Sequence, residues 1–293
     1  MIGPDIQRAR DFLENAQNSD GGWGYRTDSA SVTEPTALAL MSRPSQTALE
    51  QGVAWLLATQ KDDGGWGMNA ADDASNWLTA WAVWALLKIS AEDSLTAARA
   101  GTAWLLDVPV ARTHDPITSG LIGVDPALSG WAWQPDGGTW VEPTALSLLA
   151  LSASAPADHP RLSQGVAFLR DRVCLGGGWN VGAPINFGQQ MPPTPYQTVV
   201  TLLALRAAGI AREDPLIANS LNVLRQMLTP HVSAGSLAWG IVALRAWQAD
   251  DTPLRDRLSA RQSTAGGWEN SPYATAAALQ ALQQPQTSLS FGG

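Results

Sequence analysis

The sequence predicts an all-α protein, a closed (α/α)6 toroid in which six helical hairpins form an inner and an outer ring of helices. Two kinds of helical pattern alternate along the 293 residues, one amphipathic and one apolar on nearly every side. Gly-rich turns separate them, and the good helix formers Ala and Leu dominate the apolar segments. A helix that is apolar all round must be buried, whereas an amphipathic helix lies at a surface. The two kinds therefore belong to different layers.

The two patterns divide the chain into six repeats of roughly 45 to 50 residues, a period typical of helical arrays. The predicted outer helices span residues 5–17, 47–60, 94–108, 159–173, 214–228 and 252–262. The predicted inner helices span residues 34–41, 76–89, 142–153, 196–208, 235–247 and 273–283. Strict alternation therefore predicts twelve helices in two rings.

The repeats predict one domain that covers residues 1–293. An open solenoid of the same hairpins would carry polar capping repeats at both ends. The last repeat, "RQSTAGGWENSPYATAAALQAL", is instead as complete as the first. We therefore expect the hairpins to close into a ring.

A motif of Gln, three residues and Gly-Gly-Trp recurs at residues 17–23, 60–66 and 262–268. The glycines allow positive φ, so the chain can leave the outer helix sharply. The Gln amide can bond backbone groups that a helix end leaves unpaired, and the Trp offers a large flat face for packing between layers. We expect the motif to link neighbouring repeats. The tryptophans expected to serve this scaffold are Trp23, Trp66, Trp179 and Trp268.

Composition excludes several classes of function. The formal net charge is −8, and only two lysines accompany sixteen arginines, so a nucleic-acid partner is not expected. The apolar runs are far shorter than the ~20 residues that span a bilayer, and the N-terminus has no apolar signal-peptide centre. We therefore expect a cytoplasmic protein without a transmembrane segment. One cysteine, Cys174, and three histidines outside metal-ligand spacing predict neither a metal site nor a cofactor.

The Gly-Gly-Trp motif and the residues before it resemble a known repeat. A Leu stands four residues before the Gln in repeats one, two and six. This pattern resembles the QW repeat of squalene-hopene and oxidosqualene cyclases and, more loosely, the repeats of protein prenyltransferase β subunits. The resemblance implies an α-α toroid with an isoprenoid-sized central cavity. Repeat four has Val173 in place of the Gln, and repeats three and five lack the pattern.

The resemblance also implies a candidate acid. Class II terpene cyclases resemble one another in a D-x-D-D-T-A segment that opens an inner helix, and its middle Asp protonates an alkene or epoxide. In "EPTA", which occurs twice here, Glu34 and Glu142 hold that position two residues before the Thr. Glu142, which follows the Trp-rich stretch "SGWAWQPDGGTW", is the preferred catalytic residue. A proline replaces the companion aspartate in both copies, and an acid before Pro at a helix start can also serve as a cap, so a structural role stays open.

Tryptophans on the inner helices are the second functional clue. Trp77, Trp81 and Trp84 fall at i, i+4 and i+7, which predicts one stripe of the second inner helix. Trp239 lies on the fifth inner helix. If they face the lumen, their indole faces would stabilise carbocations and shape an apolar chain. Packing between helices is the alternative.

Two long connections, residues 108–138 and 180–196, precede inner helices. Loops of this length are uncommon unless they are functional, and a lid over the mouth of the toroid is one role open to them. The predicted substrate contacts in or beside these connections are Trp131, Trp133, Trp140, Phe187 and Tyr196.

Three functions remain open. The first is a class II-type terpene cyclase, which cyclises an apolar isoprenoid-like molecule after protonation. The second is a non-catalytic protein that binds such a molecule. The third is a carbohydrate-active (α/α)6 enzyme, which needs two opposed carboxylates about 5 to 10 Å apart. The paired acids available for it are Asp72 with Asp73 and Asp250 with Asp251. The repeats favour the first.

Overall fold

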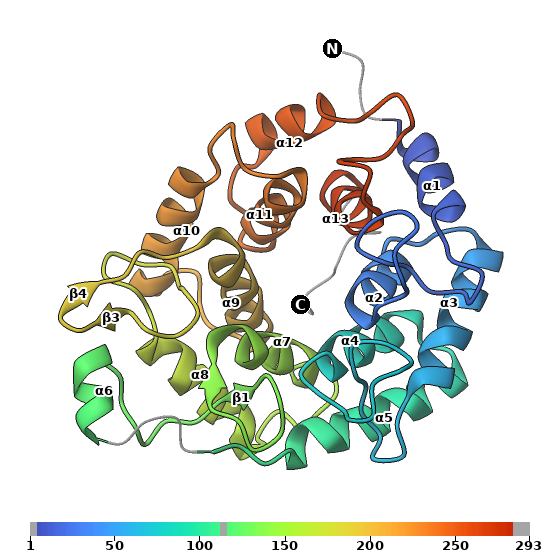
Figure 1. The fold of residues 1–293 in the computed structure, drawn as a ribbon. Coiled ribbons are helices and arrows are strands. Elements are labelled where there is room, and N and C mark those ends of the chain that lie inside the picture. Colours follow the sequence, from blue (N-terminus) through green and yellow to red (C-terminus); the bar gives the residue numbers. More distant parts are fainter. Residues whose placement is uncertain (1–4, 112–115, 284–293) are drawn as a thin grey trace.

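The computed structural model describes residues 5–111 and 116–283 and shows two concentric layers of helices (Figure 1). The inner layer contains α2 (Thr33–Met41), α4 (Thr79–Ile89), α7 (Val141–Leu151), α9 (Pro195–Ala207), α11 (Ala234–Ala246) and α13 (Pro272–Leu282). The outer layer contains α1 (Ile6–Asn15), α3 (Gln46–Thr59), α5 (Glu92–Asp107), α8 (Pro160–Asp171), α10 (Pro215–Met227) and α12 (Thr252–Ser259). The predicted all-α architecture is confirmed.

The inner helices close into a ring. Each packs against the next one along the chain, and α13 packs back against α2. Almost every described side chain of the inner helices is buried, because one face meets the outer layer and the other faces the axis of the ring. None of the described helices is long and apolar enough to cross a membrane.

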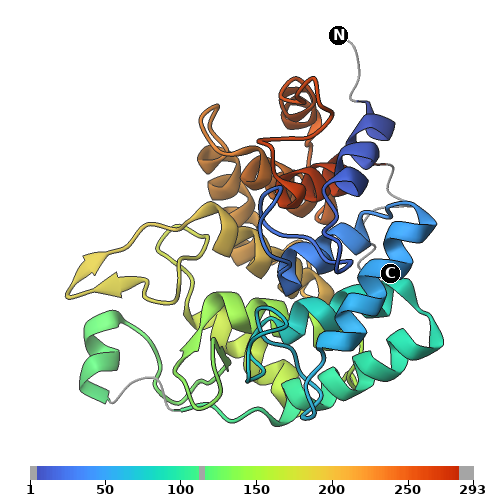
Figure 2. The same ribbon diagram turned by 45° about the vertical axis from the view of Figure 1, so that its right-hand side comes forward.

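The two long connections contain short elements that the sequence pattern did not predict. The first holds α6 (Pro116–Ile122) and an antiparallel pair, β1 (Trp131–Ala132) with β2 (Thr139–Trp140). The second holds the hairpin of β3 (Ile185–Asn186) and β4 (Gln189–Gln190). Two-residue strands are too short to leave an alternating pattern in the sequence. Figure 2 shows α6 and the hairpin at the outer edge of the ring, so these elements do not cover its mouth. Residues 112–115 of the first connection lie outside the described residues.

Five tryptophans hold the layers together through the same two hydrogen bonds. Each backbone N–H donates to a threonine hydroxyl on an inner helix, and each indole N–H donates to a leucine carbonyl of an outer helix. We call this arrangement the clasp. The Trp–Thr pairs are Trp23–Thr36, Trp66–Thr79, Trp131–Thr144, Trp179–Thr198 and Trp268–Thr275. The carbonyls belong to Leu13, Leu56, Leu105, Leu169 and Leu258.

Trp131 belongs to the clasp although repeat three lacks the full motif, so its predicted role as a substrate contact is wrong. Its indole N–H donates to Leu105 at 2.8 Å, and its side chain is only 2% exposed. Trp131 stands 13 residues before Thr144, the same spacing as the Trp–Thr pairs of the first two repeats. The Trp–Thr spacing could have identified Trp131 as a clasp residue from the sequence. Repeat three keeps the Trp and the Thr but lacks the Gln and the second Gly.

The motif glutamines link neighbouring repeats, as predicted. Gln17 donates from Nε2 to the Gly21 carbonyl of its own turn and, at 2.9 Å, to the Ala48 carbonyl in α3. Gln60 contacts α5 in the same way. Gln262 donates to the Asp5 carbonyl just before α1 at 2.8 Å, so the last repeat is tied to the first and the outer ring closes as well.

Candidate functional site

The clasp threonines give five inner helices a common register. A residue two positions before the threonine lies about 200° around the helix from it, and therefore faces the axis of the ring rather than the outer layer. We call the residues at this position the mouth ring, because they lie at the N-terminal ends of the inner helices. The mouth ring consists of Glu34, Glu142, Tyr196 and Tyr273, each in the first turn of its helix, and of Trp77, which holds the corresponding position just before α4 begins. The repeats thus place two carboxyl groups and three aromatic rings at one level.

Three tyrosines converge on Glu34. The Tyr25 hydroxyl donates to Oε2, the Tyr196 hydroxyl lies 3.4 Å from Oε1, and Tyr273 also hydrogen-bonds to the carboxyl group. These are the only tyrosines in the sequence. Burial raises the pKa of Glu34, while the three hydroxyl groups oppose that increase. Both oxygens of Glu34 are therefore occupied by protein groups.

Glu142 has a more open environment. It is only partly buried, and Gln197 donates from Nε2 to its Oε2 at 3.0 Å. The Thr194 hydroxyl donates to Oε1 of Gln197, which turns the amide nitrogen towards Glu142. Burial, and then the negative charge of Glu34, raise the pKa of Glu142 to about 7. Within the described part of the chain Oε1 of Glu142 has no hydrogen-bond partner, so this oxygen can hold a proton and present it to a ligand.

Trp81, Trp84 and Trp239 form a layer of indoles one helical turn below the mouth ring, which we call the indole floor. Trp81 of α4 and Trp239 of α11 meet with ring centroids 5.7 Å apart, although these helices lie on opposite sides of the ring (Figure 1). Trp84 packs on Trp81 at 5.6 Å. The indole N–H of Trp239 donates to the Tyr273 hydroxyl at 3.0 Å, which joins the floor to the mouth ring. The aromatic side chains therefore meet across the axis.

The predicted tryptophan stripe is only partly right. Helix α4 begins at Thr79, so Trp77 precedes it, while Trp81 and Trp84 lie on it. Trp77 packs edge to face on Trp133, with centroids 4.8 Å apart and an interplanar angle of 89°. The structure therefore places Trp77 with Trp133 at the mouth, outside the helical stripe of Trp81 and Trp84.

The other predicted contacts, Trp131, Trp140 and Phe187, do not gather at one site. Trp140 pairs with Trp131 between β1 and β2 and is the N-cap of α7, directly before the helix that carries Glu142. Both N–H groups of Trp131 are committed to the clasp. Phe187 is 77% exposed in the turn of the β3–β4 hairpin, at the outer edge of the ring. Trp131 and Phe187 are therefore removed from the candidate site.

Sequence reasoning missed Tyr25, Tyr273 and Gln197. A signal for Tyr273 was present, because "YAT" repeats the spacing of "EPT" and "YQT" with the threonine as its third residue. Tyr25 and Gln197 carry no such signal. Tyr25 lies two residues after the clasp Trp23, in a turn that only the folded chain brings over Glu34.

The alternative acids have structural partners. Asp251 forms an ion pair with Arg245 at 3.1 Å, and Asp250 accepts the backbone N–H of Thr252. Asp72 accepts the backbone N–H of Met68. These contacts argue against opposed catalytic carboxylates at either aspartate pair. Among residues 5–111 and 116–283 no three His, Cys, Asp or Glu side chains gather as metal ligands would.

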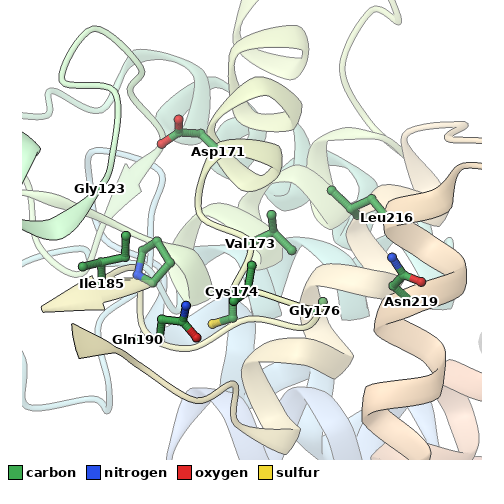
Figure 3. A pocket seen from close by; sticks show the side chains of 12 residues that line it. Gly123, Asp171, Val173, Cys174, Gly176, Ile185, Gln190, Leu216 and Asn219 are labelled. Atoms are coloured by element: carbon green, nitrogen blue, oxygen red, sulfur yellow. The ribbon is translucent and has the colours of Figure 1, made fainter. Parts of the chain in front are cut away.

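A pocket of about 420 Å³ lies outside the ring, between the β3–β4 hairpin and α10. Figure 3 shows Ile185, Cys174 and Gln190 along one side of it and Leu216 and Asn219 along the other. Cys174 is buried there, and burial raises the pKa of its thiol. No member of the mouth ring contributes to this pocket, so it is separate from the candidate site.

Parts of this sequence are similar to known proteins. A family described as the squalene-hopene cyclase C-terminal domain matches residues 1–72, which contain the first two clasp tryptophans and Glu34. Squalene–hopene cyclase of Zymomonas mobilis is 31% identical over 121 residues, or 36% of this chain and 18% of that protein. (+)-Kolavenyl diphosphate synthase of Herpetosiphon aurantiacus is 31% identical over 113 residues, 36% of this chain and 21% of that protein. The match spans about a fifth of each relative's length.

Solved structures agree in fold over most of the chain. A variant of the type II terpene cyclase MstE from Scytonema, in complex with its substrate geranylgeranyl dihydroxybenzoate, has a TM-score of 0.65 and 20% identity. The likeness covers 94% of this chain and 95% of that one. A protein from Actinoplanes has a TM-score of 0.62 and 17% identity, over 94% of this chain and 97% of that one. At such low identity these likenesses establish the toroid and not an activity.

Proposed function

We propose that the chain, which resembles class II terpene cyclases in its repeats and in its toroid fold, cyclises an apolar isoprenoid after protonation by Glu142. The observation that carries this proposal is the state of the Glu142 carboxyl group. Its pKa is raised to about 7, Gln197 fixes one oxygen, and the other oxygen has no partner in the described chain. A general acid works best when its pKa lies near the working pH.

The proposed reaction needs only groups at the mouth and the floor. The proton on Oε1 of Glu142 passes to a terminal alkene carbon, and the cation that remains is attacked by the next alkene of the same molecule. The indole faces of Trp81 and Trp239 stabilise the positive charge through their quadrupoles. Loss of a proton from the final cation gives a neutral product, so the net change is an isomerisation. Glu142 then takes up a proton before the next cycle.

Glu34 has a positioning role in this proposal. Three tyrosine hydroxyls contact its two oxygens, so it has no oxygen left for a substrate carbon. Its negative charge raises the pKa of Glu142 and so favours the protonated acid. Glu142 is therefore the residue that touches the substrate, and Glu34 acts through it.

The test is to offer the purified protein squalene, oxidosqualene, prenyl diphosphates and prenylated aromatic compounds, and to analyse the products by mass spectrometry. Geranylgeranyl dihydroxybenzoate is the first compound to try, since the structurally similar MstE was solved with it as substrate. We expect a cyclic isomer of one compound from the wild-type protein and none from Glu142→Gln. A wild-type protein that leaves every compound unchanged contradicts the proposal.

A second function is a non-catalytic isoprenoid-binding protein. The observation in its favour is the contact between Trp81 and Trp239 across the axis, which limits the depth to which a long chain can enter. Pro35 and Pro143, which stand where class II terpene cyclases have the companion aspartate, also favour a binding protein without catalysis. Saturable binding of an isoprenoid by the wild-type protein, without any product, would favour this function.

A further inference from the structure

One buried glycine on the inner ring has no packing reason to be glycine. Gly235 lies in the first turn of α11, four residues before Trp239 and therefore on the same face of the helix. Among the described residues, a Cβ atom added to Gly235 would approach nothing closer than Tyr273 Cε1, at 3.8 Å. That is an ordinary van der Waals contact, so the described part of the chain leaves room for a Cβ atom here.

The other glycines in the described helices differ from Gly235. A Cβ atom on Gly52, Gly101, Gly165 or Gly240 would come within 3.0 Å of a neighbouring side chain, so close packing explains these four. Gly120 has open space around it, but it lies on the exposed side of α6. Gly235 alone among them is both buried and uncrowded.

Gly235 lies at the level of the mouth ring, so the space beside it belongs to the candidate site. Trp239 belongs to the indole floor, and Gly235 is one turn closer to the mouth, at the level of Glu34, Glu142 and Tyr196. It is the sixth member of the mouth ring, contributed by the one repeat that has no clasp. Five positions carry a carboxyl group or an aromatic ring, and the sixth carries no side chain. Tyr273, which hydrogen-bonds to both Trp239 and Glu34, forms one side of the space.

We propose that Gly235 keeps space free beside Tyr273 for the branched, terminal prenyl group of an isoprenoid ligand, and so determines which chain ends reach Glu142. The inference rests on the proposed function for the role of Glu142, but the space itself does not depend on catalysis. Glycine lowers helix propensity relative to alanine, so this helix start gives up stability for the free volume.

The test is a graded series, Gly235→Ala and Gly235→Val, measured for thermal stability and for binding of geranylgeranyl dihydroxybenzoate by tryptophan fluorescence. Gly235→Ala should raise Tm by about 2 °C, because it fits without a clash and favours the helix. It should weaken binding several-fold, and Gly235→Val should weaken binding about tenfold or more as the space fills. A purely structural glycine would not give higher stability together with weaker binding.

Two matched controls sharpen the series. Gly120→Ala should stabilise its helix without changing affinity, since Gly120 is exposed and outside the ring. Gly240→Ala should lower Tm, because its Cβ would lie 2.5 Å from Leu228. Unchanged affinity in Gly235→Val overturns the inference and leaves the Glu142 proposal intact. A graded loss of affinity in a protein that never forms product supports the inference and contradicts the proposed catalysis. A wild-type protein that binds neither this compound nor any other of the isoprenoids offered above overturns both.

Discussion

The two "EPTA" segments start helices α2 and α7 in the same way, yet their glutamates have different environments. Each glutamate is the second residue of its helix, and each threonine accepts the N–H of a clasp tryptophan. Glu34 is then enclosed by three tyrosines, while Glu142 meets one glutamine and is partly open. The comparison teaches that the tetrapeptide sets the helix start and the register, whereas residues from other repeats set the chemistry of the carboxyl group.

The largest expected effect separates the two glutamates. Glu142→Gln should lower turnover by about 10²- to 10⁴-fold, because the amide keeps the shape but has no transferable proton. Glu34→Gln should lower turnover by only about tenfold, since Glu34 acts through the charge it places near Glu142. The measurement is kcat and KM for both variants on the compound identified by product analysis. Equal losses would remove the distinction between acid and positioning residue.

The second prediction compares the clasp with the outer edge. Trp66→Ala and Trp131→Ala should each lower the free energy of unfolding by ~3 to 5 kcal/mol, the usual cost of truncating a large buried aromatic side chain. Phe187→Ala is the control and should change it by no more than about 0.5 kcal/mol, because Phe187 is exposed. Chemical denaturation gives these values. If Trp131→Ala behaves like Phe187→Ala, Trp131 is not part of the clasp.

The third prediction concerns pH. The folded-state pKa of Glu142 is raised to about 7, so turnover should fall about tenfold per pH unit above that value as the acid ionises. Loss of the Glu34 charge makes Glu142 easier to ionise, so Glu34→Gln should move this limb to lower pH. The same raised pKa means that ionisation disfavours the folded state, so stability should decline from about pH 4.5 upwards through pH 7. Glu142→Gln should show a smaller decline, since the raised pKa of Glu34 still contributes to it, and a denaturation series against pH measures the difference.

The smallest expected effect is at Tyr25. Tyr25→Phe removes one hydroxyl donor from Glu34, so the pKa of Glu34 should rise further and the free energy of unfolding should fall by about 1 kcal/mol. Tyr25 is 42% exposed, which keeps the packing change small. Infrared titration of the carboxyl groups, with Glu34→Gln to assign the band, measures the shift. No shift would mean that Tyr25 does not bind Glu34 in solution.

Much of the scaffold could be predicted from the sequence because it depends on local patterns that recur. Gln17, the following glycines and Trp23 form a local unit, and three copies of it predicted the turns and the links between repeats. Helical periodicity predicted both layers. Trp131 was not recognised as a clasp residue, because repeat three keeps only the Trp–Thr spacing and lacks the Gln and the second Gly of the motif.

The candidate site could be predicted only in part. The spacing from Glu142 to Thr144 placed the carboxyl group at a helix start, but it could not show that Gln197 would fix one oxygen 55 residues away along the chain. The three tyrosines lie in repeats one, four and six, and only ring closure brings them to Glu34. The contact between Trp81 and Trp239 likewise depends on helices from opposite sides of the ring.

Transfer of a proton from Glu142 to carbon is the central claim, and turnover in deuterated water tests it most directly. Solvent deuterons exchange onto the Glu142 carboxyl group, so each cyclic product molecule formed from unlabelled substrate should carry one deuterium, at the carbon that was protonated first. Mass spectrometry and NMR of the product locate it, and Glu142→Gln should form neither product nor label. A cyclic product without deuterium, or a labelled product made equally well by Glu142→Gln, would contradict the account.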